Sequence, residues 1–269
     1  MFRFVLVFTL ALLLAPLAVH GQNTLSNIDD TSRLQWQHCT TPSCSGGKGF
    51  STAGVANIVE NPPFNYTVDG TSIRFDLLIS GCSSDCYSNA LFWNELSTYG
   101  VPNAGTDAAT NISLAMTVGM DSAGINGSQA LEFTVDQTFC TSGPCPDGTY
   151  TRFIYSYQCS FVGGFWNVWD AGSGSWKSTG AHCVRFSNTN PNGPSFNQFI
   201  FNFTRPDLGH VHYVDFYVNN THVVVDQTWQ PENLGSTKAH EFVASMQLDG
   251  DFHGDSYSAW VDKWSITYQ

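Results

Sequence analysis

The sequence predicts an all-β protein folded as a β-sandwich or jelly roll. From Thr71 onward, apolar and polar residues alternate in short runs rich in β-branched and aromatic residues, and clusters of Gly, Asn and Asp separate the runs. Charged residues make up 12% of the chain, whereas ordinary domains have about 25%. About ten strands at regular spacing are expected, which is typical of a single sandwich domain.

The clearest strand of the first half is "ALEFTVDQ", residues 130–137, which follows expected strands at 71–80 and 111–120. Successive side chains of a strand point to opposite faces, so the apolar residues of this one are expected in the core. They are Leu131, Phe133 and Val135. The opposite face is then formed by Glu132, Thr134 and Asp136.

The second half continues the same alternation. "YTRFIYSYQC" leads into "FWNVWDAGSGSWKSTGAHC", where the Gly-rich stretch Ala171–Gly174 predicts a hairpin between two aromatic strands. After a loop at 187–197, the remaining expected strands are "FNQFIFNFTR", "HVHYVDFYVNN" with an Asn-Asn turn into "THVVVDQTW", "HEFVASMQLDG" and "YSAWVDKWSITY".

The first 21 residues, "MFRFVLVFTLALLLAPLAVHG", predict a secretory signal peptide that is cleaved before Gln22. Arg3 precedes an apolar run that ends in small residues, and this run is shorter than the roughly 20 residues of a membrane anchor. We therefore expect a secreted protein, extracellular or periplasmic, with no membrane insertion after cleavage. Residues 22–269 contain no linker and are expected to form one domain, as a monomer.

The cysteines and the net charge restrict the compartment and the partners. All eight cysteines follow the signal peptide, and an even count in an exported chain favours disulfides. Proximity along the chain suggests four pairs: Cys39 with Cys44, Cys82 with Cys86, Cys140 with Cys145, and Cys159 with Cys183. A net charge of -12 disfavours nucleic acid as a partner, because it would repel the phosphate backbone.

Four segments resemble secreted bacterial proteins, common in soil acidobacteria, of the concanavalin A-like lectin and glucanase superfamily. They are "SNIDD", "ALEFTVDQ", "YSYQC" leading into "WNVWDAGSGSWKSTGAHC", and "MQLDGDFHGDSYSAWVDKWSITY". The resemblance implies a jelly roll of two curved antiparallel sheets, whose concave face carries a cleft for a sugar or polysaccharide. Residues 130–137 would then cross this cleft.

Glu132 and Asp136 are the candidate catalytic pair if the protein is a hydrolase. Jelly-roll glucanases of the laminarinase and lichenase type carry Glu, Asp and Glu on alternate positions of one cleft strand, whereas here Thr134 replaces the middle Asp and Asp136 the second Glu. Four residues of strand separate Cα atoms by about 13 Å, and hydrolytic carboxyl groups lie about 5 to 9.5 Å apart. A polar face that binds hydroxyls, or only water, is the alternative, and no metal is expected there.

Sugar-binding surfaces combine exposed aromatic rings, which pack against C–H faces, with short polar side chains that bind hydroxyls. The residues expected to bind carbohydrate here are Trp93, Glu132, Gln158, Asn167, Trp169 and Trp176. Alternation puts Trp166 and Trp169 on opposite faces of their strand, so one of the two is expected in the core.

Two acidic segments near the C-terminus raise the question of an ion. "DGDFHGD", residues 249–255, lacks the closing Glu of an EF-hand and is expected to be a solvated turn. Asp262 resembles the Asp that jelly-roll carbohydrate modules carry near their last strand, where it often helps to bind a structural calcium ion. That ion is an open alternative, and no other cofactor is expected.

The sequence thus favours a secreted, lectin-like protein whose partner is a polysaccharide or another glycan. Two alternatives stay open. One is an endo-acting glycoside hydrolase with Glu132 and Asp136 as its carboxylate pair, and the other is an extracellular domain whose sheet face meets another protein.

Overall fold

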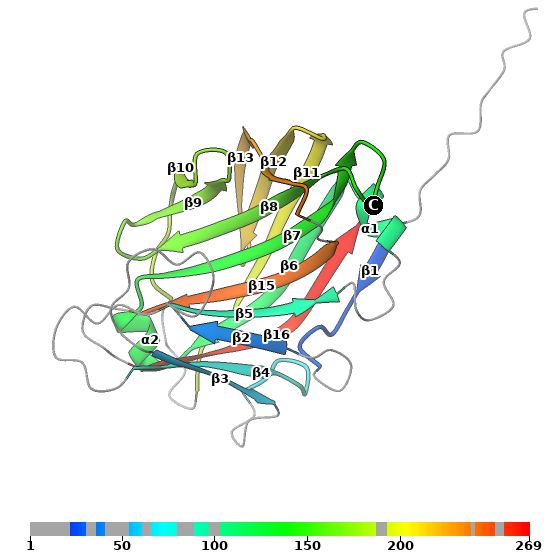
Figure 1. The fold of residues 1–269 in the computed structure, drawn as a ribbon. Coiled ribbons are helices and arrows are strands. Elements are labelled where there is room, and N and C mark those ends of the chain that lie inside the picture. Colours follow the sequence, from blue (N-terminus) through cyan, green and yellow to red (C-terminus); the bar gives the residue numbers. More distant parts are fainter. Residues whose placement is uncertain are drawn as a thin grey trace, which may run out of the picture.

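The computed structural model describes residues 22–30, 36–40, 54–60, 66–79, 89–96, 103–186, 193–237, 240–250 and 256–269. Within them the chain forms sixteen strands and two short helices, α1 (Asn103–Ala108) and α2 (Ser122–Gly127). The strands form two antiparallel eight-stranded sheets that pack as a sandwich (Figure 1). The predicted all-β jelly-roll sandwich is confirmed, with more strands than the roughly ten expected from typical spacing.

The front sheet has the strand order β10-β9-β8-β7-β15-β5-β2, and β14 pairs with β8. Its strands are β2 (Trp36–Thr40), β5 (Asn89–Glu95), β7 (Ala130–Ser142), β8 (Thr149–Ser160), β9 (Phe165–Asp170), β10 (Ser175–His182), β14 (Glu232–Gly235) and β15 (Glu241–Asp249). The predicted hairpin at Ala171–Gly174 connects β9 to β10.

The back sheet has the order β13-β12-β11-β6-β16-β4-β3, and β1 pairs with β16. Its strands are β1 (Asn23–Leu25), β3 (Gly54–Glu60), β4 (Ile73–Ile79), β6 (Asn111–Met120), β11 (Asn197–Asp207), β12 (His210–Val218), β13 (Thr221–Trp229) and β16 (Tyr257–Tyr268). The predicted Asn-Asn turn joins β12 to β13, and Asn219 adopts a φ of 52° there, a conformation that Asn tolerates better than most residues.

Each of the last two strands is inserted between two earlier strands of its sheet. β15 lies between β7 and β5 in the front sheet, and β16 lies between β6 and β4 in the back sheet. Consecutive strands also alternate between the sheets, since β4 and β6 belong to the back and β5 and β7 to the front. Each sheet therefore depends on pairing between distant parts of the chain, which makes assembly non-local.

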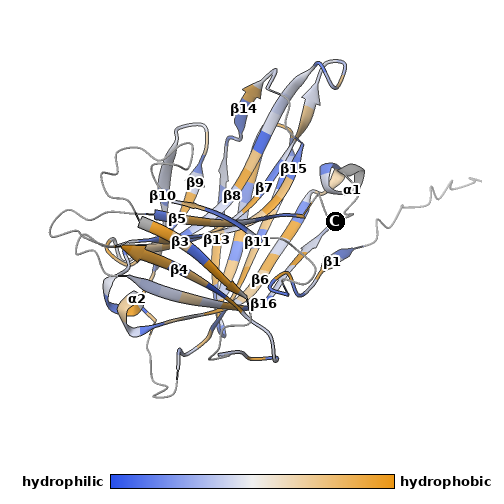
Figure 2. Cartoon of the chain, turned by 60° about the horizontal axis from the view of Figure 1, so that its bottom comes forward, coloured by the Kyte–Doolittle hydropathy of each residue, from blue (hydrophilic) through white to orange (hydrophobic). Residues whose placement is uncertain are grey.

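An aromatic core fills the space between the sheets, and Figure 2 shows its apolar residues as alternating bands along the strands. Phe133 of β7 lies with its ring centroid 5.1 Å from those of both Phe199 and Phe201 of β11. Trp166 is 3% exposed and packs 4.9 Å from Phe216. Each such ring contributes about 1.5 to 3 kcal/mol by leaving water. Of the two tryptophans of β9, Trp166 is therefore the core residue.

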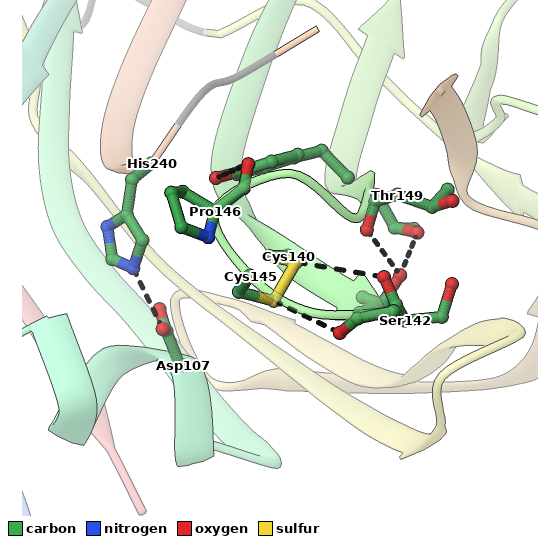
Figure 3. Close-up of a disulfide and its surroundings, with 11 residues drawn as sticks. Asp107, Cys140, Ser142, Cys145, Pro146, Thr149 and His240 are labelled. Atoms are coloured by element: carbon green, nitrogen blue, oxygen red, sulfur yellow. Dashed lines mark hydrogen bonds and ion pairs between the residues drawn. A yellow bond between two sulfur atoms is a disulfide. The ribbon is translucent and has the colours of Figure 1, made fainter. Parts of the chain in front are cut away.

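Two of the predicted disulfides are present. Cys140 and Cys145 join across a Cα distance of 6.1 Å, beside the ion pair between His240 and Asp107 (Figure 3). Cys159 of β8 is bonded to Cys183, which follows β10, with their Cα atoms 5.5 Å apart. Cys39 is also disulfide-bonded. The other predicted partners, Cys44, Cys82 and Cys86, lie outside the described residues.

Within the described ranges, neither helix has the length and apolar character needed to cross a membrane. The predicted signal peptide, residues 1–21, lies outside these ranges.

Candidate functional site

The two faces of β7 differ as the sequence predicts. Leu131, Phe133 and Val135 have no exposed surface and pack between the sheets. On the opposite face, Glu132 and Thr134 are partly exposed. This outer face of the front sheet carries the candidate site, and it is called the front face below.

A ladder of polar side chains crosses three strands of the front face. Glu132 lies opposite Gln158 of β8, which lies opposite Asn167 of β9. Asn167 Nδ2 donates to Gln158 Oε1 over 3.0 Å, and Gln158 Nε2 donates to Glu132 Oε1 over 2.9 Å. Each amide therefore fixes its neighbour, and the chain of hydrogen bonds ends on the carboxylate.

A second row runs beside this ladder and joins tryptophans through small residues. Trp93 of β5 lies opposite Ser245 of β15, which lies opposite Thr134, which lies opposite Ser156 of β8. Thr134 Oγ1 and Ser156 Oγ are 2.5 Å apart. Ser245 and Ser156 are buried, whereas Trp93 is partly exposed.

The far end of this row is an aromatic pair. Trp169 of β9 lies opposite Trp176 of β10, and their rings meet edge to face with centroids 5.1 Å apart. Both are partly exposed. The register of Tyr157 opposite Val168 puts Trp169 beside Ser156, on the same row as Trp93.

Tyr213 from the back sheet fixes the backbone at this end. Its hydroxyl oxygen accepts the N–H of Ser156 over 3.1 Å and lies 2.9 Å from the carbonyl oxygen of Trp169. Burial raises the pKa of the Tyr213 phenol, so it stays neutral and can donate. The pairing of β8 with β9 ends at Tyr157 and Val168, and the Tyr213 hydroxyl connects the two strands at the next position.

Asp136 is engaged in an ion pair. Its Oδ2 accepts from Arg152 of β8 over 2.5 Å, and its side chain is 8% exposed. Arg152 also lies 3.7 Å from Glu232 of β14. The structure therefore brings Glu132 together with Gln158 and Asn167, while Asp136 is neutralised by a guanidinium.

The carboxylate that influences Glu132 is Asp249, at the end of β15. Asp249 is 3% exposed, so it is not part of the solvated turn expected from sequence. Burial raises the pKa of Glu132 well above its usual range, and the Asp249 carboxylate raises it further, whereas the hydrogen bond from Gln158 lowers it. Burial raises the pKa of Asp249 to about 7, against a hydrogen bond from Gln247.

Strand alternation could have identified Asp249. Glu132 lies opposite Gln247, and Asp249 is two residues further along β15 on the same face. The sequence instead predicts a turn at Asp249, because the residues that follow it are rich in Asp and Gly. Of the expected turn, residues 251–255 lie outside the described residues.

Three other carboxylates form a cluster that fits a hard cation. Oxygens of Asp29, Asp69 and Asp262 lie within 4.8 Å of one another. Asp29 and Asp262 are 2% and 0% exposed, and Asp29 Oδ2 and Asp262 Oδ1 accept no hydrogen bond from the described residues. Burial raises the pKa of Asp29 to about 6. Buried, unpaired carboxylate oxygens suit calcium, which binds oxygen ligands only.

A cavity of about 300 Å³ lies on the other side of the molecule, over β6, β11, β12 and β16 of the back sheet. Its central polar groups are already bonded, since Asp215 accepts from Asn202 over 2.6 Å and lies 2.9 Å from His222. The large rings that line it, Phe203 and Tyr268, are buried. The front face offers partly exposed tryptophans and is therefore the stronger candidate.

No family model matches this chain, and no curated protein matches its sequence. Among solved structures, the lectin UEA-II complexed with galactose is 8% identical with a TM-score of 0.41, covering 93% of this chain and 99% of the lectin. The carbohydrate esterase vb_24B_21 from Shiga toxin-encoding bacteriophage phi24B is 12% identical with a TM-score of 0.41, over 87% and 90% of the two chains. These similarities are too low to assign a function.

Proposed function

We propose that the front face binds carbohydrate, with Glu132, Gln158 and Asn167 as the polar contacts and Trp93, Trp169 and Trp176 as the aromatic ones. The observation that carries this proposal is the ladder from Asn167 through Gln158 to Glu132, held by bonds of 3.0 and 2.9 Å. A preorganised row of amides and a carboxylate lowers the ordering cost of binding a ligand that has many hydroxyl groups.

The ladder keeps binding capacity after its internal bonds are made. An amide nitrogen has two N–H groups and a carboxylate has two oxygens, and among the described contacts each of these groups uses one. Donors and acceptors therefore alternate along the row, as sugar hydroxyls require. Tryptophan rings beside such a row add apolar area for the C–H faces of a sugar ring.

A glycoside hydrolase is the second candidate, and the raised pKa of Glu132 favours it, because burial that raises the pKa of a carboxyl group suits that group to general acid catalysis. Asp136 would be its partner carboxylate in the arrangement expected from sequence, but it is bound by Arg152. Asp249 is buried and out of reach of a substrate. Binding therefore ranks above cleavage.

The site is proposed to act outside the cytoplasm, after removal of residues 1–21. Two disulfides between described cysteines support an oxidising compartment. Amino-terminal sequencing of the protein exported by its host tests this, with Gln22 as the expected first residue.

One experiment separates binding from cleavage. The purified protein and its Glu132→Gln variant are run through gels that contain soluble polysaccharides, and new reducing ends are measured in parallel. Retardation of the wild type without reducing ends supports a binding protein. Reducing ends from the wild type but not from Glu132→Gln identify a hydrolase, and no retardation or cleavage across the panel overturns both functions.

A further inference from the structure

The row from Trp93 to Trp169 has a length that restricts the ligand. Trp93 is on β5 and Trp169 on β9, with β15, β7 and β8 between them. Neighbouring strands lie about 4.8 Å apart, so four steps separate the two tryptophans by about 19 Å.

Small side chains separate the two aromatic ends. Ser245, Thr134 and Ser156 occupy the three strands between them, and two of these three residues are buried. No large side chain of this row therefore lies between Trp93 and Trp169. The amide ladder of Glu132, Gln158 and Asn167 runs alongside, two residues away along each strand.

A single sugar cannot use both ends. A pyranose ring with its linking oxygen is about 5 Å long, given single bonds of about 1.5 Å at tetrahedral angles. About four linked rings are therefore needed to span 19 Å. A chain of that length would lie across the strands, with one ring near Trp93 and another near the pair Trp169 and Trp176.

The charge of the front face selects among such chains. Among its described strand residues, carboxylates outnumber cations, and Arg152 is already paired with Asp136 and Glu232. The carboxylate residues are Glu95, Glu132, Asp136, Glu232, Glu241 and Asp249. A polyanionic chain would therefore meet a face on which carboxylates are in excess, which disfavours its binding.

We propose that the ligand of the front face is an extended, uncharged polysaccharide segment of about four or more sugar units that lies across the strands between Trp93 and Trp169. This proposal rests on the proposed carbohydrate-binding function and specifies its ligand class. It predicts that affinity depends on chain length and that the tryptophan at one end matters only for ligands long enough to reach it.

The test uses titration calorimetry with cello-, laminari- and manno-oligosaccharides of two to six units, and with alginate and polygalacturonate as polyanions. Affinity for the oligosaccharide that binds is expected to rise about ten-fold or more from two to five units and then to level off. Trp93→Ala should lower the affinity for the five-unit ligand about ten-fold and leave the two-unit ligand unaffected, whereas Trp93→Phe should retain most of the affinity.

The outcomes distinguish this proposal from the function on which it rests. Equal affinity for two and five units, or tight binding of a polyanion, would overturn the ligand class while leaving carbohydrate binding in place. If Trp93→Ala lost binding of both the two-unit and the five-unit ligand, Trp93 would not be a contact that only long ligands reach, and its place at one end of the ligand would be overturned. Absence of any binding across the oligosaccharides and the polysaccharides overturns the proposed function itself.

Discussion

Gln158 donates an amide hydrogen to Glu132 over 2.9 Å while its own oxygen accepts from Asn167, so it fixes the carboxylate from the neighbouring strand. Replacing it by Met keeps the length of the side chain but removes both contacts. Gln158→Met is expected to weaken glycan binding about ten-fold, since a hydrogen bond to a charged group contributes about 1.5 to 3 kcal/mol. Titration calorimetry measures the change.

The matched control for this variant is Gln198→Met, because Gln198 is exposed on β11 of the back sheet. Its glycan affinity should equal that of the wild type. If both Gln variants bind as the wild type does, the ladder takes no part in binding.

The pair Glu132 and Asp249 predicts a dependence of stability on pH. The pKa of Asp249 is raised to about 7 and that of Glu132 is raised as well, so the folded state binds protons more tightly than the unfolded state. The contribution of Asp249 to the free energy of unfolding is therefore present below about pH 4 and is lost as the pH rises through about 7, and the contribution of Glu132 is also lost as the pH rises. Removing the Asp249 charge should reverse this loss.

Asp249→Asn is expected to raise the thermal unfolding midpoint at pH 8, by about 2 to 4 °C for each kcal/mol regained, and to change it little at pH 4.5. Scanning calorimetry between these pH values measures the difference. The control is Asp226→Asn, whose side chain is 80% exposed and should have no such effect. Parallel pH profiles for wild type and Asp249→Asn would exclude a destabilising charge at this position.

The alternation of apolar and polar residues along each strand predicts which face of the strand a site residue lies on. Alternation correctly divides β7 into its buried and outer faces, because every core residue of a strand must lie two positions from the next. It also separates Trp166 from Trp169. Alternation does not identify which strands pair with one another in a sheet.

Strand neighbours explain the residues that sequence reasoning missed. β15 lies next to β7 although more than a hundred residues separate Thr134 from Ser245, and this pairing brings Asp249 towards Glu132. The pairing of β7 with β8 likewise puts Arg152 next to Asp136. Spacing along one strand suggested that Asp136 partners Glu132, whereas its charge is met by a residue from the next strand.

The ion pair between Asp136 and Arg152 is expected to stabilise the fold. Asp136→Asn and Arg152→Met should each lower the free energy of unfolding by about 1 to 3 kcal/mol, less than for a fully buried pair because the Arg152 side chain is 39% exposed. Arg152→Met should have the larger effect, since it leaves a buried carboxylate unpaired. Urea unfolding measures both changes.

Activity is the second measurement on these variants. Glycan affinity, and any release of reducing ends, should be unchanged in Asp136→Asn once folding is verified. A folded Asp136→Asn variant that had lost cleavage would instead restore Asp136 as a catalytic residue.

The cluster of Asp29, Asp69 and Asp262 predicts that calcium stabilises the protein. Asp29 and Asp262 are buried, and each has one oxygen that accepts no hydrogen bond from the described residues. Ionisation of these carboxylates opposes folding, and a bound cation would compensate their negative charge. Calcium at 100 times its dissociation constant would add about 2.7 kcal/mol to the free energy of unfolding. Differential scanning calorimetry with calcium and with a chelator should show a midpoint several degrees higher with the ion.

Two variants and the pH dependence make this prediction specific. Asp262→Asn should abolish the response to calcium, because it removes a fully buried ligand charge, whereas Asp215→Asn on the back sheet should keep it. Since the pKa of Asp29 is raised to about 6, protons compete with the ion below that pH, and the calcium effect should be larger at pH 8 than at pH 5. Equal midpoints with calcium and chelator at pH 8 would show that the three carboxylates hold no ion.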